Sequence, residues 1–211
     1  MFAVIFEVQP KPERWDDYLA LAKQLKPKLE AIDGFIDNER FAGRRNKGLV
    51  LSLSIWRDEK SVVRWRTQGE HHGVQRKGRS DVFADYHLRV GEIIADNAPP
   101  KGIAVEERRF DETETGDAKV CTITELAPAG SEQLTEPDPR SDGLLGHELF
   151  ESITNPGKLL ILASWRDKVA AQKWRQAGSE ATRHRLVRVI RDYGMFDRRE
   201  APQFYPDAAR K

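Results

Sequence analysis

Three polar side chains with useful chemistry recur at every fourth position of one helical stretch. His71, Gln75 and Arg79 share a helix face, because residues four apart lie one above the other. An imidazole, an amide and a guanidinium can together hydrogen-bond a small molecule, move a proton and balance a negative charge. The stripe borders a ligand pocket or, as the ordinary alternative, faces solvent.

Other groups of reactive residues give weaker patterns. His71 and His72 are adjacent, and neighbouring helical residues point about 100° apart, so they form a poor metal pair. No cysteine or carboxylate set at zinc spacing accompanies them, and we expect no metal. The basic run Arg44–Lys47 has no interleaved aromatic residues, which is typical of a solvated turn rather than of a nucleic-acid surface.

Composition excludes further classes of function. The 35 basic and 34 acidic residues nearly cancel, which argues against nucleic acid or a membrane surface as a partner. The sequence has no run of about 18 apolar residues and no basic leader before its first apolar stretch. The single cysteine, Cys121, is typical of a reducing compartment and of a buried position in a strand. We therefore expect a cytoplasmic protein without a membrane span.

The strongest feature of the sequence is an internal repeat. Gly34–Arg66 and Gly143–Arg175 align without a gap, and each copy carries two tryptophans at the same spacing. The matching pairs are Trp56 with Trp165 and Trp65 with Trp174. Because tryptophan is rare and the unit occurs only twice, the repeat indicates a duplicated domain rather than a repeat array.

The first copy has the pattern of a βαββαβ unit. Apolar, β-branched runs predict strands at Phe2–Val8, Phe35–Phe41, Leu49–Trp56 and Tyr86–Ile94. Helical periodicity predicts helices at Glu13–Ile32, Glu59–Thr67 and Glu70–Ala84. This order is that of a ferredoxin-like unit, an antiparallel sheet with helices on one face.

The second copy keeps this order but lacks room for its first helix. Strands are predicted at Lys119–Leu126, within Leu144–Trp165 and at Tyr193–Arg199, and helices at Lys168–Gln176 and about Ser179–Arg191. Only Ala127–Asp142, with three prolines, remains for the first helix. The predicted domains are therefore residues 1–96 and a degenerate unit over 119–211, joined by a linker over 97–118.

One strand carries large apolar residues on both faces. Leu51 and Leu53 point to one side, and Val50 and Trp56 to the other. A strand of this kind is buried on both sides, so the sheet needs a partner on the face that its helices leave open. The predicted fold is α+β, with two tandem ferredoxin-like units packed sheet to sheet as an intramolecular dimeric α+β barrel.

The stretch Ser54–Val90 carries a family resemblance. It combines a tryptophan at a strand end, a tryptophan in the next helix, a His, Gln, Gly-Arg helix and a strand that reads Tyr-x-Leu-Arg-Val. These residues are Trp56, Trp65, His71, Gln75, Gly78, Arg79 and Tyr86–Val90. The sequence resembles the antibiotic-biosynthesis-monooxygenase-like proteins of the dimeric α+β barrel superfamily, over the whole first half and through Trp165 and Trp174 in the second.

The resemblance implies a monooxygenase with no bound cofactor. Its substrate would be a small aromatic, polyketide-like or quinol molecule held in an apolar pocket. The resemblance assigns Trp65 to shape the pocket and His71 and Tyr86 to bind or deprotonate the substrate. Arg66, Gln75 and Arg79 would bind the substrate, the arginines by stabilising its anion. The corresponding candidates in the second half are Trp174, Arg175, His184 and Tyr193.

The haem-degrading branch of the superfamily is similar too and implies an alternative. Its iron ligand is a histidine on the long helix, ten positions after the helix tryptophan, where this sequence has His184 in one half and Gln75 in the other. The branch also uses an asparagine on the first strand, which neither half carries. Haem binding by His184 is therefore a second hypothesis, and a non-catalytic small-ligand-binding module is a third. Self-association of the fused pair stays open.

Overall fold

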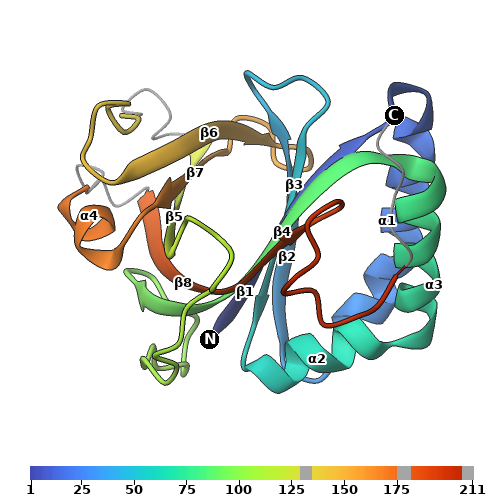
Figure 1. Ribbon diagram of the computed structural model, residues 1–211, viewed down its shortest axis with the longest axis horizontal. Helices are drawn as coiled ribbons and strands as arrows, with labels where there is room; N and C mark the ends of the chain where they lie inside the picture. The colour runs from blue at the N-terminus through green and yellow to red at the C-terminus, as the bar shows by residue number, and fades with distance from the viewer. Residues whose placement is uncertain (129–134, 175–181, 206–211) are drawn as a thin grey trace.

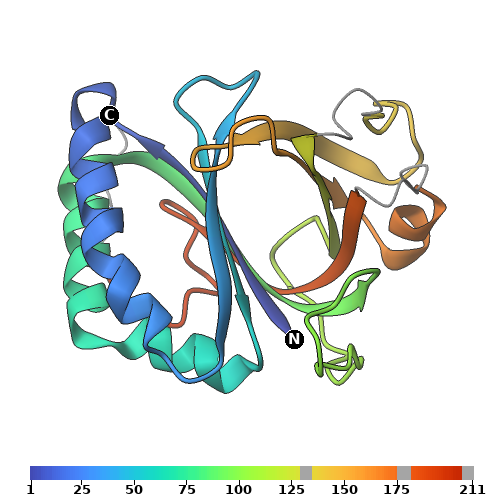
Figure 2. The ribbon, with the colours of Figure 1, turned by 180° about the vertical axis from the view of Figure 1, so that it is seen from behind.

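The computed structural model describes residues 1–128, 135–174 and 182–205. Within them, eight antiparallel strands close into one barrel in the order β1-β3-β2-β6-β7-β5-β8-β4 (Figures 1 and 2). The first half supplies β1 (Phe2–Pro10), β2 (Phe35–Gly43), β3 (Val50–Trp56) and β4 (Phe83–Asp96). The second half supplies β5 (Val120–Leu126), β6 (Leu144–Ser152), β7 (Leu159–Trp165) and β8 (Thr182–Gly194).

The helices are distributed unequally over the barrel. The first half carries α1 (Trp15–Glu30), α2 (Glu59–Thr67) and α3 (Gly69–Lys77), and a π-helical turn, Gly78–Val82, leads from α3 into β4. All three helices lie against the outer face of the first-half strands (Figure 1). In the described part of the second half, the only helix is α4 (Lys168–Lys173). The first half thus has a helical layer that can roof a site.

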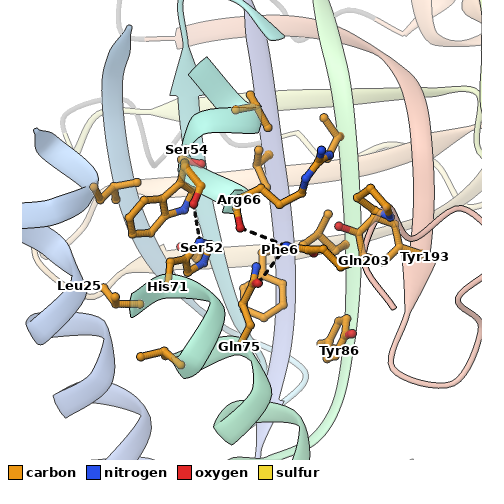
Figure 3. Close-up of a pocket in the computed structure, with 18 of the residues that line it drawn as sticks. Phe6, Leu25, Ser52, Ser54, Arg66, His71, Gln75, Tyr86, Tyr193 and Gln203 are labelled. Atoms are coloured by element: carbon orange, nitrogen blue, oxygen red, sulfur yellow. Dashed lines mark hydrogen bonds between the residues drawn. The ribbon is translucent and has the colours of Figure 1, made fainter. Parts of the chain in front are cut away.

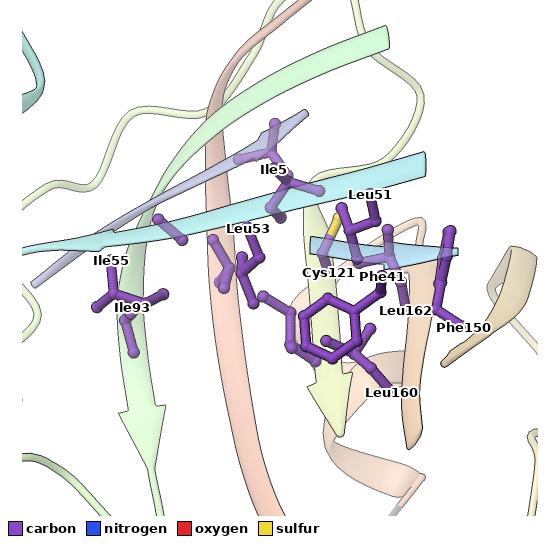
Figure 4. Packing of buried hydrophobic residues seen from close by; sticks show 14 of the residues in the cluster. Ile5, Phe41, Leu51, Leu53, Ile55, Ile93, Cys121, Phe150, Leu160 and Leu162 are labelled. Carbon is purple, nitrogen blue, oxygen red and sulfur yellow. The ribbon is translucent and has the colours of Figure 1, made fainter. Parts of the chain in front are cut away.

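The barrel interior is an apolar core shared by both halves (Figure 4). Leu51 and Leu53 meet Leu160 and Leu162 there, while Val50 and Trp56 lie in clusters on the outer face, under the helices. The predicted two-sided burial of β3 is therefore confirmed. Cys121 is also fully buried in this core, as predicted, and burial raises the pKa of its thiol.

The two halves meet edge to edge. Phe41–Gly43 of β2 pair with Phe150–Ser152 of β6, and His87–Asp96 of β4 pair with Arg185–Gly194 of β8. The predicted α+β class and the barrel are confirmed, with hydrogen-bonded seams joining the sheets. The ferredoxin-like nature of each half stays a prediction, because the described part of the second half shows no helix between β5 and β6.

The last part of the chain differs from the prediction. The helix predicted at about Ser179–Arg191 is wrong where the structure describes it, because β8 begins at Thr182 and pairs with both β4 and β5. The strand predicted at Tyr193–Arg199 is also wrong, since β8 ends at Gly194. Val187 and Val189 point into the barrel core, and this burial between two neighbouring strands favours the extended conformation.

No helix of the described ranges combines the length and the apolarity needed to cross a membrane.

Candidate functional site

A pocket of about 190 Å³ lies between the outer face of the first-half sheet and its helices (Figure 3). Strands β1 to β4 and β8 form its floor, and α1, α2 and α3 form its roof. Residues Met195–Tyr205, hereafter the C-terminal segment, turn back from β8 into the space beside these helices (Figure 1). Arg198, Gln203 and Tyr205 of this segment line the pocket.

Strand register gives the floor a polar edge on either side of an apolar middle. Across β2, β3, β1, β4 and β8, one row of neighbours reads Arg40, Ser52, Phe6, Leu88 and Tyr193. The next row reads Asn38, Ser54, Val4, Val90 and Arg191. An apolar body can therefore lie over the centre while its polar groups reach the edges.

Trp65 and His71 form one unit of the roof. Their rings stack with centroids 3.9 Å apart, and His71 Nδ1 lies 2.9 Å from the Trp65 carbonyl oxygen. Because a carbonyl only accepts, Nδ1 carries the proton and Nε2 keeps a lone pair. Burial lowers the pKa of His71 to about 4, against an opposing contribution from the Trp65 carbonyl. The imidazole is thus neutral at physiological pH.

Tyr86 lies beneath two arginines. Arg79 Nη1 donates to the Tyr86 hydroxyl oxygen at 2.9 Å, and Arg198 Nη1 donates to it at 2.6 Å. Arg79 also donates to the Met195 carbonyl oxygen at 3.0 Å. Since the phenol oxygen accepts both bonds, its own proton is left for another acceptor.

The C-terminal segment is held against α2 and α3 by polar and ring contacts. Gln203 Nε2 donates to the Arg66 carbonyl oxygen at 3.0 Å and to Gln75 Oε1 at 3.3 Å (Figure 3). The Tyr205 hydroxyl donates to Gln75 Oε1 at 3.1 Å, and its ring stacks on His72. Second-half residues of β8 and of the C-terminal segment therefore complete a pocket that is built mainly by the first half.

The charge lining the pocket is strongly positive. Among the described residues, five arginines line it (Arg40, Arg66, Arg79, Arg191 and Arg198), together with one acidic residue, Glu59. Glu59 already forms an ion pair with Arg109. Three buried polar atoms of lining residues have no hydrogen-bond partner in the described part of the chain: Tyr18 Oη, Arg40 Nε and Arg66 Nε. Unpaired buried donors in a cationic pocket favour an anionic ligand.

Six residues predicted from the sequence lie together in this pocket. They are Trp65, Arg66, His71, Gln75, Arg79 and Tyr86. Tyr193, a second-half candidate, lies here as well, because it pairs with Leu88 across the β4–β8 seam. Burial beside Tyr86 raises the pKa of Tyr193 to about 12. The chemical roles given to these residues stay predictions.

Two further second-half candidates, Trp174 and His184, do not line the pocket. Trp174 stacks on Trp165, at 6.0 Å between centroids, and packs into a separate apolar cluster. Arg175 lies outside the described residues.

His184 is the candidate whose placement is corrected. It lies on strand β8 and not on a helix, and its Nδ1 is 2.9 Å from the Thr124 hydroxyl. The haem hypothesis needed a helix histidine after the helix tryptophan, and this requirement is not met. Within the described ranges, no group of three or more His, Cys, Asp or Glu side chains could hold a metal ion.

Several lining residues were not predicted from the sequence. Asn38 and Arg40 alternate along β2, and this alternation could have shown that they face the helices. Arg191, Arg198, Gln203 and Tyr205 gave no comparable signal, because their place depends on β8 lying beside β4.

Comparisons with known proteins agree with this architecture. Residues 1–77 and 131–183 match the model of a family described as antibiotic biosynthesis monooxygenase. A protein of Pyricularia oryzae named jasmonate monooxygenase ABM is 44% identical over 222 residues, which cover 99% of this chain and 100% of that protein.

Two solved structures share the fold. An aldoxime dehydratase in complex with butyraldoxime has a TM-score of 0.56 at 10% identity, with 90% of this chain and 79% of the other covered. A second aldoxime dehydratase structure has a TM-score of 0.55 at 11% identity, with coverages of 89% and 80%. At such low identity, these similarities concern the fold alone.

Proposed function

Because this chain belongs to the antibiotic biosynthesis monooxygenase family, we propose that it is a monooxygenase acting on a small, mainly apolar carboxylic acid of the jasmonate type. The observation that carries this proposal is the pocket's lining, in which the described residues supply apolar side chains, five arginines and one carboxylate that is already paired. Jasmonate is a cyclopentanone with an unsaturated side chain and a carboxylate arm. Such a molecule needs an apolar bed and a cationic partner.

The proposed roles follow the geometry of the pocket. Trp65 shapes the roof and fixes His71 through the ring stack and the carbonyl hydrogen bond. The unprotonated Nε2 of His71 accepts a proton or a hydrogen bond from the substrate. Tyr86, oriented by Arg79 and Arg198, donates its hydroxyl proton to a substrate oxygen.

The proposed chemistry balances without a bound cofactor. Removal of a proton beside a ketone gives a carbanion, which adds O₂ to form a hydroperoxide. Loss of water then converts CH–OOH to C=O, so that one oxygen atom stays in the product and the substrate supplies the electrons. A phenol or quinol follows the same electron balance and is the second candidate, favoured by the neutral imidazole of His71 within the pocket.

Oxygen uptake tests the proposal. Purified protein is supplied with jasmonate, or with a panel of phenols and quinols, each with and without NADPH and flavin. Without added reductant, we expect one O₂ to be consumed for each product molecule formed. The product is detected by mass spectrometry. His71→Phe and Tyr86→Phe should each lower kcat by about 100-fold or more, the scale of a lost proton-transfer group.

Two results would contradict this function. No turnover of any substrate class, with or without reductant, would favour the plain ligand-binding module. Uptake that both variants leave unchanged would remove His71 and Tyr86 from the mechanism. A haemin titration of the wild type and of His184→Ala provides the remaining comparison, since the haem hypothesis requires saturable binding that the variant loses.

A further inference from the structure

Arg40 and Tyr18 bring two hydrogen-bond donors to one side of the pocket. Arg40 lies on β2 and Tyr18 on α1, and both line the pocket. Burial raises the pKa of the Tyr18 phenol, and the nearby Arg40 guanidinium opposes that rise. The two groups are therefore close in space although 22 positions separate them in the sequence.

Neither donor has a hydrogen-bond partner outside this pair among the described residues. Tyr18 is only 5% exposed, its hydroxyl interacts with the half-buried Arg40, and neither that hydroxyl nor the buried Arg40 Nε bonds to another described group. The neighbouring acid, Glu39, belongs to another site, where it accepts hydrogen bonds from Ser152, Asn155 and Lys158. Among the described residues, no acidic side chain forms an ion pair with Arg40. The partner that Arg40 and Tyr18 still need is therefore negatively charged.

Most of the other pocket arginines are engaged by the protein. Arg79 and Arg198 share the Tyr86 hydroxyl, and Arg198 also donates to the Gln203 carbonyl oxygen at 2.9 Å. Arg191 lies near the carboxylate of Asp111. Arg66 lies near Tyr193. Within the described ranges its Nε is without a hydrogen-bond partner too.

We propose that Arg40 and Tyr18 are the carboxylate receptor of this enzyme and determine its specificity for free acids. This inference rests on the proposed function and adds the residues that select the substrate. The carboxylate accepts hydrogen bonds from the Arg40 guanidinium and from the Tyr18 hydroxyl. A neutral ester at the same place would leave the guanidinium without a counter-charge.

The receptor also fixes the direction in which a substrate lies. Tyr18 belongs to the apolar cluster with Phe83 and Tyr86, whereas Trp65 packs in the cluster that contains Leu29. Tyr18 and Leu29 are separated by roughly 16 Å along α1, at the usual rise per residue. When the carboxylate binds at Arg40, the apolar part of the substrate therefore lies along the floor of the pocket toward Trp65.

Binding of an acid and of its ester tests the receptor directly. The dissociation constants of jasmonic acid and methyl jasmonate are measured by titration calorimetry at pH 7 for the wild type, Arg40→Met, Tyr18→Phe and Lys23→Met. We expect the wild type to prefer the acid by roughly 10- to 100-fold, the value of hydrogen bonds to a charged group. Arg40→Met should remove most of this preference, and Tyr18→Phe should lower it several-fold.

Lys23→Met is the matched control. Lys23 is an exposed lysine on α1, the helix that carries Tyr18. Its replacement by Met changes the net charge by the same amount as Arg40→Met and leaves the pocket lining intact, so the wild-type preference for the acid should persist. An unchanged acid-to-ester ratio in both Arg40→Met and Tyr18→Phe would overturn the receptor, and Tyr18→Phe decides if Arg40→Met does not fold. Wild-type oxygen uptake with jasmonate stands apart from this ratio, so a failed receptor and a failed function give different results.

Discussion

The two ring nitrogens of His71 have different surroundings. Nδ1 donates to the Trp65 carbonyl oxygen, while the ring is stacked on an indole that keeps water away from it. Desolvation disfavours the imidazolium, which is why the pKa of His71 falls from 6.5 to about 4. A neutral imidazole with a fixed tautomer is an acceptor that does not titrate between pH 5 and 8.

This shift makes the folded protein sensitive to acid. Above pH 6.5, His71 is neutral in both the folded and the unfolded chain. As the pH falls from 6.5 toward 4, His71 becomes protonated in the unfolded chain but stays neutral in the folded protein. The free energy of unfolding therefore drops by roughly 1 kcal/mol per pH unit. His71→Phe keeps a ring on Trp65 and removes the titration. Urea unfolding between pH 7 and 4.5 should show a shallower loss of stability in the variant.

Equal slopes for the wild type and His71→Phe would mean that the folded protein protonates His71 over this range. The pH dependence of activity is a second test of the protonation state of His71. With a pKa of about 4, His71 should give kcat/KM no inflection near pH 6.5.

At the scale of elements, the C-terminal segment, Met195–Tyr205, forms one side of the pocket and is called the strap below. Arg198 attaches the segment to the barrel through the Tyr86 hydroxyl and the face of Tyr193. It also connects parts of the segment through the Gln203 carbonyl and the face of Tyr205. The next residue, Arg199, is exposed and pairs with Asp197. Of these two adjacent arginines, Arg198 therefore contacts the pocket, whereas Arg199 lies at the surface.

Arg198→Ala should release the strap, whereas Arg199→Ala should not. Loss of hydrogen bonds from a charged donor costs roughly 1.5–3 kcal/mol, so we expect a KM at least about 10-fold higher in Arg198→Ala. Chymotrypsin should also cleave the variant faster after Phe196 and Phe204. Arg199→Ala should stay within about twofold of the wild type in both measurements. Similar effects of the two substitutions would show that the segment is not held through Arg198.

The same element shows where sequence reasoning ends. His71, Gln75 and Arg79 could be predicted because their helical spacing is local, and all three line the pocket. Strand β8 could not, because Leu186, Val189 and Ile190 also have helical spacing, and a buried inward arginine, Arg185, hides the strand alternation. The Arg185 charge is paired with Glu125 and Asp96, which the sequence alone does not reveal.

At the scale of the whole molecule, the β4–β8 seam links the barrel to the pocket. It brings Tyr193 and Arg191 to the floor and sets the starting point of the C-terminal segment. The seam contains an irregularity at Val90 and Gly91. A pocket on one half therefore depends on the register of the other half.

Gly91→Ala should loosen this seam. A Cβ at position 91 would lie 2.2 Å from the Arg188 carbonyl oxygen and 2.6 Å from Val187 Cγ1, so the two strands would have to separate. Overpacking of this kind costs roughly 2 kcal/mol, which corresponds to a melting temperature lower by about 4–8 °C for a chain of this size. Gly146→Ala is the control on β6, where an added Cβ meets no atom within 4 Å. Because the seam carries Tyr193 and the strap, Gly91→Ala should also weaken substrate binding, while Gly146→Ala should change neither property. Equal melting temperatures for the two variants would show that the close approach at Gly91 can relax without opening the barrel.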